Sequence, residues 1–219
     1  VVACARSNHR GCAVSAAVAM HSLAADPVLV HRDRLLDPAF VAERFGLVRR
    51  RRAKYRIGES LRAVYESTVD GAVFAARMTT GDTAGAIYER ACRTACPVDG
   101  HPGVELDASH GIVWFRLPNE RRLRNVDRVL DPVAEAWPGE PAWRASQIEE
   151  YAPERSLTVR ALDDDGEILG YAKLYRPDTD IVTPARRADA LAAALEPFDV
   201  GVAKARWVDP IQTLTFLEP

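Results

Sequence analysis

The sequence predicts an α+β fold made of two related units, each an antiparallel sheet with one helix packed on it. The clearest strand pattern covers residues 156–162, where Leu157, Val159 and Ala161 alternate with more polar neighbours. Period-two alternation of this kind is typical of a strand with one buried face. The second observation is an internal repeat, because residues of the first half of the chain recur in the second half in the same order.

The repeat has a nearly constant spacing of 94 to 96 residues. An offset of 96 carries Arg77 onto Lys173. The other matches are Tyr55 with Tyr151, Ser60 with Ser156, Leu61 with Leu157, Ala76 with Ala172, Asp70-Gly71 with Asp165-Gly166, and 36–38 with 130–132. Such self-similarity indicates a duplicated structural unit. We therefore expect a first unit over 35–110, a connecting strand–helix segment over 111–141 and a second unit over 142–219.

The first unit is preceded by residues 1–34, which we interpret as a leader or short helix, with a signal peptide as the alternative. Asp37 as N-cap and Pro38 at the first helical position predict a helix over 35–45. Later elements are a run of four arginines (49–52) at the charged start of a strand, strands over 55–65 and 72–79, and a helix from Asp82 or Thr83 to Cys96. A phosphate or nucleic-acid patch is the alternative reading of the arginine run.

The connecting segment contains one strand and one helix. Residues 111–117 are apolar and aromatic and predict a strand, which Pro118 ends. Residues 120–130 place Leu123, Val126 and Val129 on one face and arginines on the other, as an amphipathic helix does. Residues 137–141 read as a linker into the second unit.

The second unit has the pattern strand, strand, helix, strand, strand. Asp164, Asp165 and Gly166 supply turn chemistry between the strands at 156–162 and 168–175. Thr183 and Pro184 predict the start of a helix over 185–196, and strands follow over 201–207 and 212–217. Lys173 lies inside the second strand, where burial is costly unless the ammonium reaches water or meets an anion. A lysine on the solvent face is the alternative.

This order of elements resembles the small lobe of the kinase fold, and the details over 35–219 resemble the aminoglycoside phosphotransferase-like family. The resemblance implies that Arg155 and Ser156, in the loop over 153–156, cover a nucleotide. Lys173 would bind its phosphates and Asp189 would be the acidic partner of that lysine. Phe216 and Glu218 would belong to the hinge that holds adenine through main-chain groups. Arg77 stands in the lysine position of the first unit, which makes that unit a degenerate copy.

The resemblance also implies that a part of the enzyme is missing from this chain. Phosphoryl transfer needs metal-binding carboxylates and a group that orients the acceptor hydroxyl. The family's His-x-Asp loop does not follow Lys173. We therefore expect the nucleotide-binding part of an ATP-dependent phosphotransferase that is inactive alone, uses ATP and Mg²⁺ when complete, and has an unidentified hydroxyl acceptor. The alternative is a non-catalytic binding or regulatory module with the same topology.

Composition and net charge limit the kinds of partner that the protein is expected to bind. The net charge of −2 argues against nucleic acid, and no apolar run approaches the ~18 residues of a membrane span. Cys4, Cys12, Cys92 and Cys96 are expected to be reduced thiols of a cytoplasmic protein. A zinc site formed by these cysteines with His9 is a weaker alternative, because no CxxC spacing is present.

Overall fold

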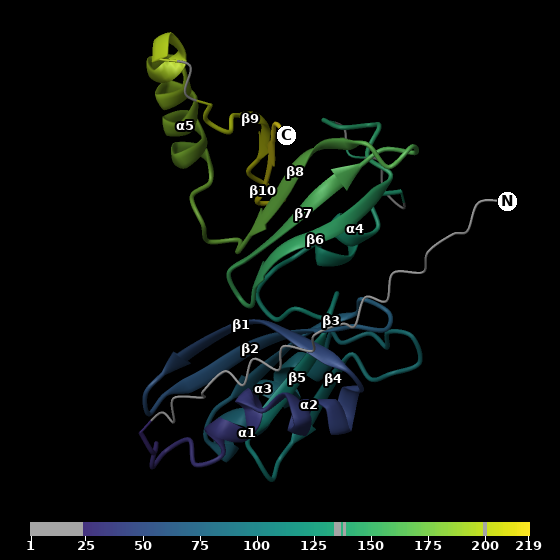
Figure 1. Cartoon of the computed structure of the whole chain (residues 1–219), viewed down its shortest axis with the longest axis vertical. Helices are drawn as coiled ribbons and strands as arrows, with labels where there is room; N and C mark the ends of the chain where they lie inside the picture. The colour runs from purple at the N-terminus through teal and green to yellow at the C-terminus, as the bar shows by residue number, and fades with distance from the viewer. Residues whose placement is uncertain (1–23, 134–136, 138, 199–200) are drawn as a thin grey trace, which may run out of the picture.

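The computed structural model describes residues 24–133, 137, 139–198 and 201–219, and its first half forms a five-stranded antiparallel sheet with three helices (Figure 1). The elements of this first unit are α1 (Arg32–Leu36), α2 (Pro38–Phe45), β1 (Val48–Arg56), β2 (Ser60–Ser67), β3 (Val73–Met78), α3 (Gly81–Cys92), β4 (Val104–Asp107) and β5 (Ile112–Arg116). The strand order is β1-β2-β3-β5-β4.

The second half forms another five-stranded antiparallel sheet, drawn above the first in Figure 1. Its elements are α4 (Val126–Leu130), β6 (Ala145–Ala152), β7 (Ser156–Leu162), β8 (Ile168–Tyr175), α5 (Val182–Leu195), a 3₁₀ turn (Glu196–Phe198), β9 (Ala205–Asp209) and β10 (Leu214–Leu217). The strand order, β6-β7-β8-β10-β9, matches that of the first sheet position by position. The predicted α+β fold with two antiparallel sheet units is confirmed.

The pairing of the strands shows that the residues matched by the internal repeat occupy equivalent positions in the two sheets. On β3, Arg77 lies opposite Arg62 of β2. On β8, Lys173 lies opposite Thr158 of β7, which is 96 residues after Arg62. Arg77 and Lys173 therefore occupy the same position in the third strand of their sheets.

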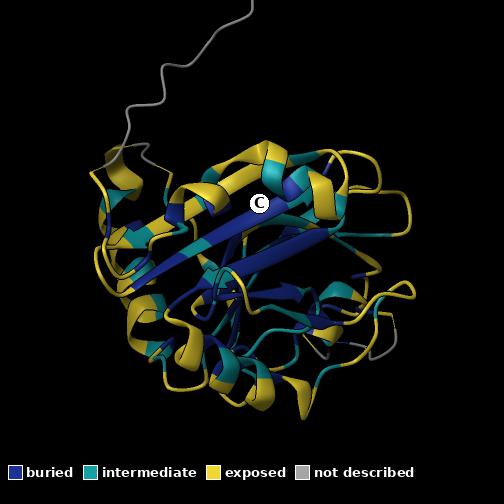
Figure 2. Ribbon diagram, turned by 90° about the horizontal axis from the view of Figure 1, so that it is seen from below, coloured by how far each residue is buried: buried dark blue, intermediate teal, exposed yellow. Residues whose placement is uncertain are grey.

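Each face of the first sheet is buried against a different partner. One face, with Leu61 and Phe74, packs against α1 and α2. The other face, with Val64 and Val113, joins a core that continues through Leu157 of the second sheet. The inner strands accordingly form most of the buried interior, and the helices carry much of the exposed surface (Figure 2). Leu157 and Val159, which the alternating pattern predicted to be buried, are 0% exposed, and so is Leu61 of the first sheet.

The segment expected to connect the units is divided between them. The strand predicted over 111–117 is β5, which pairs with β3 and β4 and is a central strand of the first sheet. Ile112 to Phe115 are all buried because both faces of this strand are covered. β4 was not predicted, since its sequence Val-Glu-Leu-Asp is short and half charged. The helix expected over 120–130 is confined to α4, preceded by Asn125 in a left-handed conformation (φ 60°).

Helix α5 differs from the expected helix in its start and its packing. It begins at Val182, and the carboxylate of Asp180 accepts hydrogen bonds from the backbone N–H groups of Val182 and Thr183, so Thr183 is not the cap. Its main contact with the sheet is along β9, and Figure 1 shows it at the outer edge of the unit. The short helix α4 instead packs across β6, β7 and β8. The alanine-rich α5 offers a weak apolar stripe, with Leu191 51% exposed.

Candidate anion-binding site

The two sheets meet through their first hairpins. Arg51 of β1 donates hydrogen bonds to the backbone carbonyls of Ile148 (3.3 Å) and Glu149 (2.9 Å) on β6. Arg52 forms an ion pair with Glu150 on the same strand. The β1–β2 and β6–β7 turns are thereby brought to the same side of the molecule.

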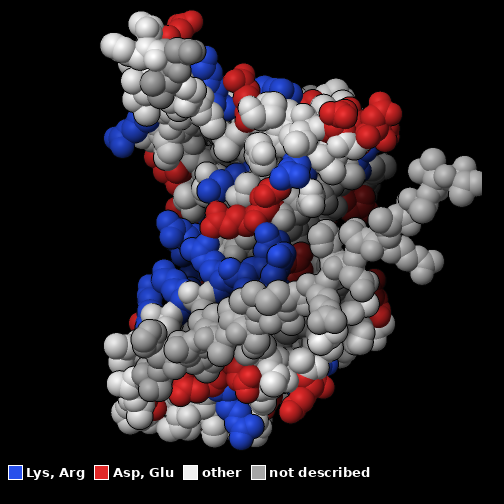
Figure 3. All heavy atoms as spheres, in the orientation of Figure 1, with Lys and Arg blue, Asp and Glu red and all other residues white. Residues whose placement is uncertain are grey.

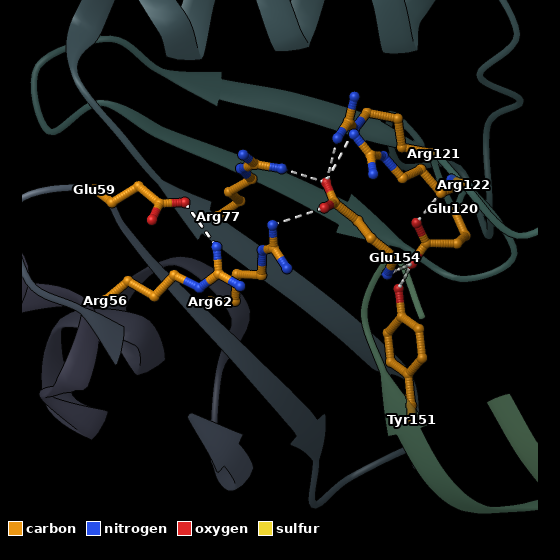
Figure 4. Close-up of polar contacts among 9 residues, drawn as sticks. All are labelled: Arg56, Glu59, Arg62, Arg77, Glu120, Arg121, Arg122, Tyr151 and Glu154. Carbon is orange, nitrogen blue, oxygen red and sulfur yellow. Dashed lines mark hydrogen bonds and ion pairs between the residues drawn. The ribbon is translucent and has the colours of Figure 1, made fainter. Parts of the chain in front are cut away.

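Glu154, in the β6–β7 turn, is the centre of the contact between the units (Figure 4). Its carboxylate accepts hydrogen bonds from Arg77 (2.5 Å) and from Arg121 (2.7 and 2.9 Å), and pairs with Arg62 at 2.9 Å. The residue is only 8% exposed. Burial opposes ionisation of Glu154, but the three guanidinium groups outweigh it and hold its pKa below the ordinary value.

The turn that carries Glu154 is supported by a second, partly buried acid. Glu120 accepts a hydrogen bond from the hydroxyl of Tyr151 and another from the backbone N–H of Glu154 (3.0 Å). Burial, reinforced by the charge of Glu120, raises the pKa of Tyr151 well above its ordinary value. Glu120 therefore holds both the turn and the strand that leads into it.

The first unit contains the same arrangement. Asp26 accepts hydrogen bonds from the hydroxyl of Tyr55 and from the backbone N–H of Gly58 (2.9 Å). The hydrogen bond from Tyr55, followed by those from the backbone, lowers the pKa of Asp26. Sequence reasoning missed this duplication because the acid is an aspartate in one unit and a glutamate in the other, and each lies far along the chain from its turn, 32 residues before Gly58 and 34 before Glu154.

A cleft of about 730 Å³ lies between the two units beside these turns. Nine of its lining residues are lysine or arginine and three are glutamate. In Figure 3 this surface is a continuous band of basic side chains between the two halves of the molecule. Because the whole chain carries a net charge of −2, the positive charge is concentrated here rather than spread over the surface.

Carboxylates neutralise only part of this charge. The paired cations of the lining are Arg52 with Glu150, Arg56 with Glu59, Arg62 and Arg77 with Glu154, and Arg176 with Asp178. Within the described residues, Lys54, Arg122, Arg155 and Lys173 have no carboxylate at ion-pair distance. Lys173 has its ammonium 5.5 Å from the centre of the Tyr175 ring. Unpaired cations that gather in one hollow are suited to a multiply charged anion.

Three of the six residues predicted from the sequence come together in this cleft. Lys173, Arg155 and Ser156 all line it. Asp189 lies exposed on α5, outside the lining, and makes no ion pair with Lys173 in the described part of the chain. Phe216 is fully buried beside Trp143 and Trp207, and Glu218 is exposed after the last strand.

Sequence reasoning missed the contribution of the first unit to the cleft. Arg52, Lys54 and Arg56 lie at alternate positions of β1, so they share one face of the strand. This period-two spacing of cations was present in the sequence, but the adjacent run at 49–52 obscured it.

The donor set of the cleft does not suit Mg²⁺. Its carboxylates, from Glu59, Glu150 and Glu154, are each bound to an arginine. Across the described residues, no three His, Cys, Asp or Glu side chains are grouped for a metal ion. Cys92 and Cys96 are free thiols, whereas the other proposed zinc ligands, Cys4, His9 and Cys12, lie outside the described residues.

In the described ranges, no helix combines the length and the apolarity that crossing a lipid bilayer requires. No family model, curated protein or solved structure matches the chain.

Proposed function

We propose that this chain binds the phosphate groups of a nucleotide in the cleft between its two sheets. It would act in the cytoplasm as the nucleotide-binding part of an ATP-dependent phosphotransferase of the aminoglycoside phosphotransferase-like type. The single observation that carries the proposal is the gathering of Lys54, Arg122, Arg155 and Lys173 in one cleft, where no carboxylate of the described residues pairs with them. Mg²⁺ would arrive with the nucleotide, since the cleft has no suitable ligands of its own.

The second unit has the groups that phosphate recognition requires. Lys173 supplies a flexible point charge from β8, and Arg155 supplies a planar guanidinium that can bind two phosphate oxygens together. Ser156 adds a hydroxyl at the first position of β7. These groups lie on the β6–β7 turn, at the start of β7 and on the third strand of the second sheet, and their convergence on one cleft supports the proposal.

The proposal predicts that Lys173→Met weakens ATP binding about tenfold. A hydrogen bond to a charged group contributes about 1.5–3 kcal/mol, and 1.4 kcal/mol corresponds to a factor of ten. Isothermal titration of the chain with ATP measures the change. Lys204→Met is the matched control, because Lys204 is exposed and lies outside the cleft. Equal affinity of Lys173→Met and Lys204→Met for ATP would remove Lys173 from the site.

A non-catalytic binding module is the second candidate function. It is favoured by Phe216, which is part of the core and pairs through its backbone with β8 and β9. The backbone proposed to bind adenine is thus paired with neighbouring strands. The cleft, as the described residues form it, therefore offers positive charge for phosphates but no pocket for the base. Titration with tripolyphosphate separates the candidates: tighter binding of ATP than of tripolyphosphate supports nucleotide recognition, and equal binding supports the module.

A further inference from the structure

A row of cations crosses the first sheet on the face that lines the cleft. Lys54 of β1 lies directly opposite Arg62 of β2, and Arg62 lies directly opposite Arg77 of β3. Like charges at directly opposed positions of neighbouring strands are destabilising. A sheet that keeps three cations in such a row therefore needs an anion over them.

The protein's own anion covers only one end of the row. Glu154 binds Arg62 and Arg77, and it also binds Arg121 from the other side (Figure 4). Lys54 is beyond its reach and has no carboxylate partner among the described residues. The set of four cations and one carboxylate retains a net charge of +3.

The uncovered end of the row faces the loop proposed to bind phosphate. Lys54 and Arg155 line a small cavity of about 40 Å³ as well as the main cleft. Arg122, which precedes α4, lines the main cleft from the connecting segment. Cations from the first unit, the connecting segment and the second unit thus face one space.

We infer that the cleft takes a linear chain of at least three phosphoryl groups, and that its far end is bound by Lys54 and Arg122. This inference rests on the proposed function, in which Lys173 and Arg155 bind the near end. Each phosphoryl group adds negative charge, so a chain matches a site whose unpaired cations come from three segments better than a single phosphate does. The first unit has Arg77 where the second has Lys173, but under this inference it still contributes cations to the binding site.

The test is a titration series with phosphate, pyrophosphate, tripolyphosphate and ATP on the whole chain. For the wild type we expect affinity to rise at least tenfold from pyrophosphate to tripolyphosphate. Lys54→Met is expected to abolish that rise, because it weakens the binding of tripolyphosphate more than the binding of pyrophosphate. Lys173→Met is expected to weaken pyrophosphate and tripolyphosphate alike, and Lys204→Met to change neither.

Thermal melting of the same variants excludes a folding defect. Lys54 is exposed and lies beside Arg62, so Lys54→Met relieves repulsion and is expected to keep or raise the melting temperature. If ATP binds to the wild type but Lys54→Met retains the gain for tripolyphosphate, the inference is wrong and the proposed function stands. If the wild type binds neither ATP nor tripolyphosphate, both are wrong.

Discussion

Glu154 occupies a backbone conformation that its counterpart in the first unit fills with glycine. Its φ is +63°, and Gly58, 96 residues earlier in the same type of hairpin turn, has a φ of +66°. A left-handed conformation costs a non-glycine residue roughly 1–2 kcal/mol. The second unit tolerates this strain because the side chain that glycine lacks binds Arg62, Arg77 and Arg121.

At the residue scale, Glu154→Gln is expected to destabilise the protein by about 3 kcal/mol, as happens when one partner of a buried ion pair is removed. The variant leaves three largely buried guanidinium groups without their counter-charge. Urea denaturation at neutral pH measures the change. Glu89→Gln, at an exposed position of α3, is the matched control and is expected to denature with the wild type.

The same carboxylate predicts a dependence of stability on pH. Because the folded protein holds the pKa of Glu154 below its ordinary value of 4.5, this group stabilises the fold above that pH and the contribution is lost as the pH falls. Glu154→Gln should therefore lose less stability than the wild type between about pH 5 and pH 3. A residual loss from Asp26, whose pKa is also lowered, is expected in both proteins. If both proteins lost the same amount of stability between about pH 5 and pH 3, the ion pairs of Glu154 would not be the source of the pH dependence.

At the scale of elements, strand β7 has the clearest division between its faces. Leu157, Val159 and Ala161 are 0% exposed, whereas Thr158 and Arg160 are only partly buried. The buried face packs in the same core as α4, and the other face carries Thr158 opposite Lys173. One strand thus contributes to stability on one side and to the position of the basic strand on the other.

Leu157→Ala is accordingly expected to lower the free energy of unfolding by about 2–5 kcal/mol, the usual cost of truncating a buried leucine. Urea denaturation followed by circular dichroism measures this change. Leu191→Ala makes the same truncation at a position 51% exposed on α5 and is expected to cost far less. If the two variants lost similar amounts of unfolding free energy, burial of the apolar face of β7 would not be a main source of stability.

At the scale of the whole molecule, the two sheets share one core. The hydrophobic cluster that begins with Val64 and Val113 in the first sheet continues without a break to Leu157 and Phe216 in the second. The ion pairs of Glu154 lie beside this junction and join the same two units. The cleft is therefore formed by parts that stabilise one another.

This continuity predicts that the two units unfold together. Native-state hydrogen exchange should give β3 and β8 amides the same free energy of opening, since cooperative units exchange as one. In Leu157→Ala the protection of both strands should fall by the same amount, although the change lies in the second sheet. A loss of protection restricted to β8 would mean that the units are independent.

The amino-acid sequence by itself determined the local structure and its duplication. Alternating residues such as Leu157 and Val159 specify a strand and its buried face, because side chains point to opposite faces of a strand in turn. Turn residues such as Gly166 and the offset between Arg77 and Lys173 then specify hairpins and a repeat. All of these signals depend on neighbours along the chain or on comparison of the chain with itself.

Only the tertiary structure decided which charges meet. Glu154 lies 77 residues from Arg77 along the chain and 33 from Arg121. The local sequence around these residues does not indicate that they form ion pairs. The helix that carries Asp189 packs along β9 and not across β8, because its apolar stripe is too weak to compete for the sheet. Long-range pairing follows from which faces of two sheets bury the most apolar surface, and that choice set Lys54 and Lys173 on one cleft.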